Sequence, residues 1–228
     1  NCSVPLYRDD IENANDLAEE IIRLYGYDHI TCTLMDSGKQ TIGGKRIELQ
    51  NVDNIKNLLI GEGMNEVYSY SFTTPKMFDL LEVPADSKLR NVVKLLNPLG
   101  EDLSIMRTTL AGSMIEIMAK NITRGNKNAR FFEFANTYMP KALPISEQPV
   151  ETQKLALGVY GETEDFYTIK GIIENIIAYF GVKASYVRPD CCYLHPGISA
   201  DVVVDGKVVA TFGEVRPDIA AKYDIKNK

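Results

Sequence analysis

Four carboxylates near the start of the chain form the clearest chemical pattern in the sequence. Asp16, Glu19 and Glu20 stand at i, i+3 and i+4, a spacing that places three side chains on one face of a helix. Asp10 lies just before that helix and can fold back toward it. Hard cations such as magnesium prefer oxygen ligands, usually one or two carboxylates completed by water. The four residues are therefore a candidate metal site.

The same residues also have a purely structural explanation. Acidic side chains near a helix N-terminus are stabilised by the helix dipole, by roughly 0.3–1 kcal/mol each. Arg23 lies four residues after Glu19 and seven after Asp16, where it can neutralise them. The spacing alone leaves metal binding and helix stabilisation open as alternatives.

Two other groups of residues give weaker evidence for a functional site. Cys191, Cys192 and His195 are of the types that bind zinc, but their spacing matches no zinc module and a fourth ligand is missing. The sequence His-Pro-Gly at 195–197 is more typical of a turn. The basic segment Lys120–Arg130 either meets RNA phosphates or forms a solvated turn between a helix and a strand. The sequence contains no Walker A loop.

Composition limits the classes of function. The 228 residues carry a formal net charge of -6, with a sequence pI of about 5.1. Proteins that grip phosphates usually have a basic surplus, so any contact with nucleic acid is local or supplied by a partner. Cys2, Cys32, Cys191 and Cys192 form no CxxC pair, which is typical of free thiols in a reducing cytoplasm. No apolar run approaches the ~20 residues of a membrane span.

The start of the chain carries its own signal. It opens with Asn-Cys-Ser-Val-Pro, without Met and without a signal peptide. This beginning indicates a piece cut from a longer protein.

The elements that must position these residues can be read from periodicity and turn signals. Apolar spacing predicts helices over 11–25, 51–62, 109–124 and 168–180. A strand end is expected at 4–8 and strands at 66–72, 130–139 and 155–160, with a polar connection at 145–152. Asp205-Gly206 between β-branched runs predicts a hairpin over 202–209. Strands outnumber helices after residue 66, which favours an α+β fold with a mainly antiparallel sheet.

The domain boundary is expected in a glycine-rich polar stretch. Residues 36–45 contain three glycines and two lysines, which is typical of a linker or exposed loop. We predict the C-terminal part of a small α/β domain at 1–36, a linker at 37–47, and a larger domain at 48–228.

Several runs of residues together resemble the beta subunit of bacterial phenylalanyl-tRNA synthetase. The densest spans Val4–Ile11 and Asp16–Asp28 and ends in Tyr-Gly-Tyr. The others are Asn97-Pro98-Leu99, Met106–Leu110, Phe132-Glu133-Phe134, Leu194-His195-Pro196-Gly197 and Phe212–Pro217. The resemblance covers nearly the whole chain.

The resemblance implies a scaffold and not a catalytic centre. The larger domain would be a catalytically silent class II synthetase-like core, a mainly antiparallel sheet flanked by helices, preceded by a partial small domain. The active site would lie in an alpha subunit that joins phenylalanine to its tRNA with ATP and magnesium. Two alpha and two beta chains would form the enzyme. In the family, carboxylates matching Asp10, Asp16, Glu19 and Glu20 are assigned to magnesium shared with the alpha subunit.

Departures from working class II motifs agree with a silent core. Such a core needs cationic side chains where charge develops on ATP, including an Arg-x-Glu in its second motif. The nearest match is Arg107-Thr108-Thr109, without the carboxylate. The third motif is reduced to Gly213-Glu214-Val215-Arg216, with a single glycine. Relatives often carry Arg at the position of Ile198, so this chain departs from the family there and does not carry that Arg's anion contact.

The sequence therefore leads to one main hypothesis and two alternatives. The main hypothesis is a non-catalytic beta-subunit fragment that scaffolds the alpha subunit and supports charging of tRNA, with no catalytic residue and no editing activity of its own. The alternatives are a self-sufficient small class II-like ligase and an RNA-binding module that uses the basic segment Lys120–Arg130.

Overall fold

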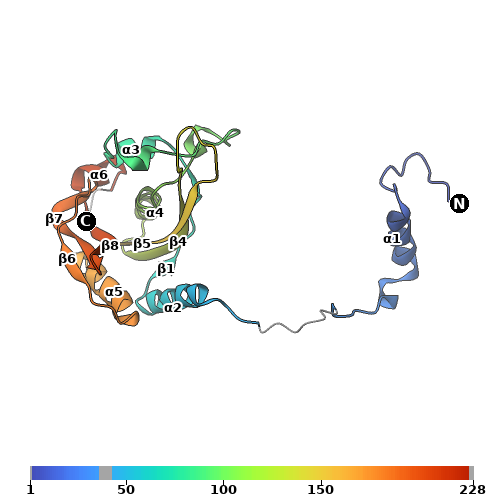
Figure 1. The fold of residues 1–228 in the computed structure, drawn as a ribbon, viewed down its shortest axis with the longest axis horizontal. Helices are drawn as coiled ribbons and strands as arrows, with labels where there is room; N and C mark the ends of the chain where they lie inside the picture. Colours follow the sequence, from blue (N-terminus) through green and yellow to red (C-terminus); the bar gives the residue numbers. More distant parts are fainter. Residues whose placement is uncertain (1, 36–42, 226–228) are drawn as a thin grey trace. The chain divides into compact units, whose positions relative to one another are not determined.

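The computed structural model describes residues 2–35 and 43–225. The chain separates into two compact units, Asn1–Lys45 and Arg46–Lys228 (Figure 1). Of the predicted linker at 37–47, residues 37–42 lie outside the described residues. Each unit is described by itself below.

The smaller unit is built around one helix, α1 (Ala14–Tyr25), followed by the 3₁₀ turn η1 (Tyr27–His29). The helix begins three residues later than predicted because Asn13 caps it, accepting a hydrogen bond from the backbone N–H of Asn15 at 2.8 Å. Gly26 ends it with a φ of 117°, a conformation that favours glycine. The strand end expected at 4–8 is wrong: the N–H of Arg8 donates to the Pro5 carbonyl, closing a turn.

The larger unit contains the remaining elements. Its helices are α2 (Ile47–Gly61), α3 (Lys76–Leu80), α4 (Ala111–Thr123), α5 (Phe166–Tyr179) and α6 (Pro217–Lys222), with 3₁₀ turns η2 (Lys88–Arg90) and η3 (Glu101–Leu103). Its strands are β1 (Asn65–Glu66), β2 (Phe72–Thr73), β3 (Ile105–Met106), β4 (Ala129–Met139), β5 (Val150–Tyr160), β6 (Ser185–Val187), β7 (Leu194–Val204) and β8 (Lys207–Val215). None of the helices in the described part of the chain is long and apolar enough to cross a membrane.

The strands form three small sheets, where the sequence suggested one. Their orders are β1-β4-β5, β2-β3 and β6-β7-β8, and every pairing is antiparallel except β1 with β4. The predicted β7–β8 hairpin is confirmed, with Asp205 and Gly206 at φ 49° and 75°. β5 begins five residues earlier than predicted because it pairs with β4 to the end, Val150 opposite Met139. Pairing thus extends a strand into residues whose polarity indicated a loop.

Helix α5 lies between two of the sheets, and this explains its broad apolar surface. Ile172 packs with Leu59 of α2 and with Phe132 of β4 in one cluster. The next residue, Ile173, packs with Val202 of β7 and with β8 in another. Consecutive isoleucines therefore serve different cores, which an amphipathic helix with a single partner does not need.

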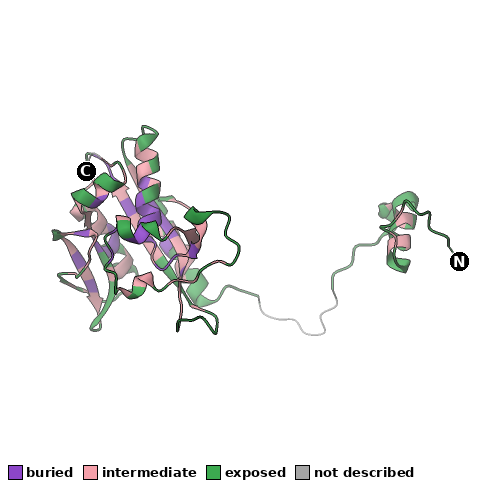
Figure 2. Cartoon of the chain, turned by 90° about the horizontal axis from the view of Figure 1, so that it is seen from above, coloured by how far each residue is buried: buried purple, intermediate pink, exposed green. Residues whose placement is uncertain are grey.

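A third cluster lies around α4, which contacts β5, and includes residues of α3 and α6. Burial is concentrated in these clusters of the larger unit, as Figure 2 shows in purple. Within α1 no residue is buried, and Leu24 is 80% exposed. Among its described residues, 2–35 and 43–45, the smaller unit thus has no buried apolar side chain.

Candidate functional site

Two of the predicted metal ligands are bound to an arginine of the same unit. Arg8 grips Asp10 with two parallel hydrogen bonds, Nε to Oδ1 at 2.8 Å and Nη2 to Oδ2 at 2.7 Å. The same Nη2 donates to Oε1 of Glu20 at 2.8 Å. Arg23 donates to the other oxygen of Glu20 at 2.6 Å. Asp10 does fold back toward the helix, but a guanidinium group joins it to Glu20.

The other two predicted ligands have different surroundings. Asp16 serves the helix start: its Oδ2 accepts hydrogen bonds from the backbone N–H groups of Glu12 and Asn13, both at 2.9 Å. This is the reciprocal half of a capping box. Glu19 is exposed, and within the described residues its side chain has no hydrogen-bond or ion-pair partner. Asp16 therefore supports the structural explanation through helix capping, whereas Arg23, expected to neutralise Asp16 and Glu19, pairs with Glu20.

The charges of this cluster stabilise one another. Hydrogen bonding to Arg8 lowers the pKa of Asp10, and hydrogen bonds to Arg8 and then to Arg23 lower the pKa of Glu20. The pKa of the Arg8 guanidinium is raised by the same two carboxylates. Asp10 and Glu20 are thus held ionised, as a metal would need, but their oxygens are already taken by a cation.

In this arrangement the four carboxylates do not form a single preformed magnesium site. Arg8 uses two of them, and Asp16 is engaged by the helix backbone. Among residues 2–35 and 43–225, no three or more His, Cys, Asp or Glu side chains are grouped so that they could hold a metal. Sequence reasoning missed Arg8. The available signal was its position two residues before Asp10, on the segment that folds back toward the helix.

The candidate second-motif arginine is buried inside the larger unit. Arg107 and Glu133 form an ion pair with Nη1 and Oε1 3.4 Å apart, and their side chains are only 3% and 2% exposed. Ser69 bridges them: its hydroxyl accepts from Arg107 at 2.6 Å and contacts Glu133 Oε2 at 2.8 Å. Arg107 also donates to the carbonyls of Tyr70 and Asn136. This side chain is directed at protein groups and is not accessible to a nucleotide.

The candidate third-motif arginine is occupied as well. Arg216 donates to Asp218 at 3.0 Å, to Glu82 at 2.8 Å and to the Cys192 carbonyl at 2.6 Å. Glu82 also forms an ion pair with Lys222. These ion pairs connect α6 to the turn after α3. Gly213 lies where β8 runs close to β7, because an added Cβ would come within 2.5 Å of the Ile198 carbonyl. The glycine thus serves strand packing.

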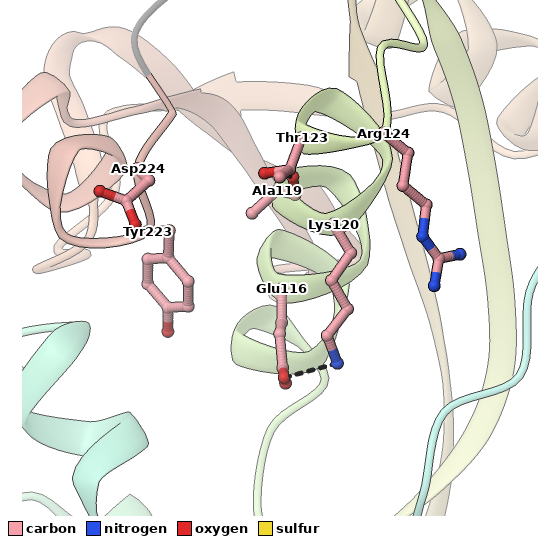
Figure 3. A pocket seen from close by; sticks show the side chains of 7 residues that line it. All are labelled: Glu116, Ala119, Lys120, Thr123, Arg124, Tyr223 and Asp224. Carbon is pink, nitrogen blue, oxygen red and sulfur yellow. Dashed lines mark hydrogen bonds and ion pairs between the residues drawn. The ribbon is translucent and has the colours of Figure 1, made fainter.

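Two of the basic side chains in the segment Lys120–Arg130 are held in ion pairs. Lys120 pairs with Glu116 one helical turn earlier at 2.8 Å, and Arg130 pairs with Glu164 at 3.1 Å. Figure 3 shows Arg124 extending away from the Glu116–Lys120 pair and from Tyr223. An open depression of about 340 Å³ between α4 and the residues after α6 is lined by Glu116, Lys120, Arg124 and Tyr223, among others. The segment therefore offers phosphates fewer free cations than its sequence indicates.

In the group formed by Cys191, Cys192 and His195, the histidine has a structural role. Cys191 and Cys192 are half-buried free thiols, and burial raises the pKa of Cys192, which favours the thiol over the thiolate that zinc needs. His195 lies in β7, and its Nδ1 accepts a hydrogen bond from the Gly197 N–H at 3.1 Å. Pairing of β7 with β8 is irregular between Leu194 and Ser199. The predicted turn is therefore an irregularity within a strand.

Comparison with known proteins gives a consistent family for both units. A family model described as phenylalanyl tRNA synthetase beta chain CLM domain matches residues 32–228, and one described as tRNA synthetase B5 domain matches residues 1–27. The phenylalanine–tRNA ligase beta subunit of Clostridium tetani is 41% identical over 230 residues, which cover 100% of this chain and 29% of that protein. That of Clostridium acetobutylicum is 40% identical, covering 98% and 28%. The chain thus spans less than a third of these relatives.

A solved structure supports the fold. The pyrrolysyl tRNA synthetase PylSc of Desulfitobacterium hafniense superimposes with a TM-score of 0.62 at 14% identity, over 92% of this chain and 68% of that one. At this identity the likeness concerns architecture alone, a mixed arrangement of antiparallel sheets and helices.

Proposed function

Because the chain belongs to the phenylalanyl-tRNA synthetase beta-chain family, we propose that it is a non-catalytic part of a phenylalanine–tRNA ligase. Its role is to scaffold an alpha subunit that carries out ATP-dependent charging of tRNA with phenylalanine in the cytoplasm. The assembly holds two alpha and two beta chains. The chain itself supplies no catalytic residue.

The observation that carries the proposal is that the two candidate motif arginines, Arg107 and Arg216, pair with carboxylates of the chain itself. Transfer of an aminoacyl or adenylyl group requires cations aimed at developing negative charge. Arg107 instead neutralises Glu133 in the interior, and Arg216 neutralises Glu82 and Asp218 at the surface. Freeing Arg107 for a substrate would leave a buried carboxylate without a partner, which costs several kcal/mol. The two arginines therefore stabilise the fold of the core.

Exposed aromatic side chains next to the buried pair support a partner-binding role. Ser69 points inward to Glu133, while its neighbours Tyr68 and Tyr70 are 79% and 73% exposed. Ser69 lies between β1 and β2, and its hydrogen bonds to Glu133 hold this segment against the core while both tyrosines remain exposed. Tyrosine is enriched among residues that dominate binding energy at protein interfaces. We propose that this segment contacts the alpha subunit.

Magnesium belongs to the proposal only for the complete assembly. Asp10, Asp16, Glu19 and Glu20 supply the oxygen chemistry that the ion prefers, and the alpha subunit would complete the site. In the chain alone Arg8 and the helix cap take up most of those oxygens. ATP would bind only in the alpha subunit.

The proposal is tested by mixing this chain with its cognate alpha subunit, followed by size-exclusion chromatography with light scattering, with and without magnesium. We expect a joint peak for the wild-type chain and a weaker one for the Tyr68→Ala/Tyr70→Ala variant. Tyr167→Ala, at a side chain 74% exposed elsewhere in the chain, is the matched control. Separate peaks for the wild type, or phenylalanine-dependent ATP–pyrophosphate exchange by the chain alone, would refute the proposal.

An RNA-binding role is the second candidate, favoured only by Arg124 and Lys127, which have no ion-pair partner among the described residues. Phosphate contacts release counterions, so binding of this kind weakens steeply with salt. Absence of a salt-dependent tRNA shift would exclude it.

A further inference from the structure

The segment that carries the two exposed tyrosines, residues 67–71, is attached to strand β4. The Val67 N–H donates to the Phe132 carbonyl at 2.9 Å, and the Ser69 N–H donates to Oε1 of Glu133 at 2.9 Å. The Ser69 hydroxyl donates to Oε2 of the same carboxylate at 2.8 Å. Residues 67 and 69 are therefore held at β4, while the tyrosines beside them stay exposed.

Arg107, which directly follows strand β3, attaches the same segment through its backbone and its side chain. Its N–H donates to the Ser71 carbonyl at 3.0 Å. Its Nη1 donates to the Ser69 hydroxyl at 2.6 Å and to the Tyr70 carbonyl at 3.2 Å. The side chains of Arg107 and Glu133 are almost fully buried, so water does not compete for these bonds. The segment is thus fixed by groups of two different strands.

We infer that Arg107, Glu133 and Ser69 are positioning residues for a protein-binding site. They fix the backbone that presents Tyr68 and Tyr70 to the alpha subunit, and the buried ion pair acts without touching that subunit. The inference rests on the alpha-subunit contact proposed above and concerns how the site is held ready for it. Ordering a loop during association costs free energy, so a segment that is already ordered binds its partner more tightly.

Stability alone does not explain why this place in the core holds charged side chains. A buried ion pair is often no more stabilising than well-packed apolar residues of similar volume, because both charges lose their hydration. An apolar pair, however, has no atom that bonds the Ser69 N–H, the Ser69 hydroxyl or the Tyr70 carbonyl. In this chain all three groups are bonded to Arg107 or Glu133. The charged pair therefore adds control over the backbone at the tyrosines.

The test measures binding of the 228-residue chain to its cognate alpha subunit by isothermal titration calorimetry, alongside urea unfolding. The double variant Arg107→Met/Glu133→Leu replaces the ion pair by apolar side chains. We expect it to bind roughly three- to tenfold more weakly than the wild type although its urea midpoint stays close to that of the wild type. Equal affinity of the two proteins would overturn the inference.

A milder variant, Ser69→Ala, keeps the test decisive even where the double variant folds poorly. It should also weaken binding, whereas Ser199→Ala, which removes a part-buried hydroxyl bonded to the His195 carbonyl, should bind like the wild type. Since Ser69 acts through the tyrosines, Ser69→Ala should change the affinity of the Tyr68→Ala/Tyr70→Ala variant by less than about twofold. A full additional loss there would contradict positioning.

Hydrogen exchange on the chain alone separates this inference from the proposed function. Ser69→Ala should lower the protection of the amides at 67 and 69 and leave that of β7 unchanged. Unchanged protection at 67 and 69 would refute positioning, whatever the chain binds. Failure of the wild-type chain to bind the alpha subunit would instead refute the proposed function, and with it the partner named here.

Discussion

Two arginine–carboxylate groups, one in each unit, show how burial changes what the same chemistry does. Arg8, Asp10 and Glu20 meet at the surface of the smaller unit, where water can replace any partner. Arg107 and Glu133 meet inside the larger unit, where Ser69 and two backbone carbonyls satisfy their remaining groups. The exposed group is exchangeable, whereas the buried one is fixed because either partner alone would be an uncompensated buried charge.

The contrast extends to how each unit is held together. The larger unit has clusters around Phe132, Ile105 and Val202, each side chain almost fully buried. The smaller unit relies on a capping box, a turn and ion pairs around α1. Interactions of the second kind are individually small, so that unit is suited to rearrangement.

The largest expected effect tests the buried ion pair. Arg107→Met should destabilise the larger unit by about 3–5 kcal/mol because Glu133 loses its counter-charge. Urea unfolding followed by circular dichroism measures the change. The double variant Arg107→Met/Glu133→Leu should recover much of the loss. A single variant that costs less than about 1 kcal/mol would mean that the pair is not buried as described.

A somewhat smaller effect compares the cores of the two units. Leu59→Ala removes a fully buried side chain in the cluster beneath β4 and should cost about 3 kcal/mol. Leu24→Ala changes the same residue type in α1, where it is 80% exposed, and should stay within about 0.5 kcal/mol. Urea midpoints of the two variants give the comparison, and similar losses would contradict the absence of a core around α1.

A third effect concerns alkaline pH. Burial, aided by the nearby Glu116 carboxylate, raises the pKa of Tyr223 to about 12, so the folded chain holds this proton more tightly than the unfolded chain. Stability from this group is complete below the ordinary tyrosine pKa of 10.0 and is lost as the pH rises toward about 12. The urea midpoint should decrease between about pH 10 and about pH 12, and decrease less in Tyr223→Phe. Equal slopes for both proteins would contradict the assignment.

The smallest effect is expected for the exposed ion group. Arg8→Gln should leave the urea midpoint of the larger unit unchanged, because Arg8 belongs to a separate unit and its pairs are exposed. A clear loss of stability in the larger unit would show that the two units are energetically coupled.

Local signals predicted much of the larger unit. Helix α5, strand β4 and the Asp205-Gly206 hairpin lie within two residues of their predicted ranges or enclose them. Local signals could not predict the pairing of strands that lie far apart in the sequence. β5 extends through polar residues because β4 lies beside it, and the division into three sheets depends on pairings between residues far apart in the sequence, such as Phe72 with Met106.

The metal site stays a prediction, and the sequence did not reveal how its four residues are arranged. The i, i+3, i+4 spacing placed three carboxylates on α1, yet it could not reveal that Asp16 accepts from the backbone at the helix start. Arg8 was missed because its role depends on the turn at Pro5, which replaced an expected strand end. Likewise, only the folded chain brings Ser69 and Glu133, 64 residues apart, into contact.

Helix α5 has a consequence for how the larger unit comes apart. Since Ile172 belongs to one cluster and Ile173 to the other, a fluctuation that detaches this helix exposes both sheets together. The helix thereby couples the two sheets, so we expect amide protons of β4 and β7 beneath it to exchange at similar rates. Removing the helix would expose apolar side chains of both sheets, which the cluster around α4 would still connect through Phe131 and Val215.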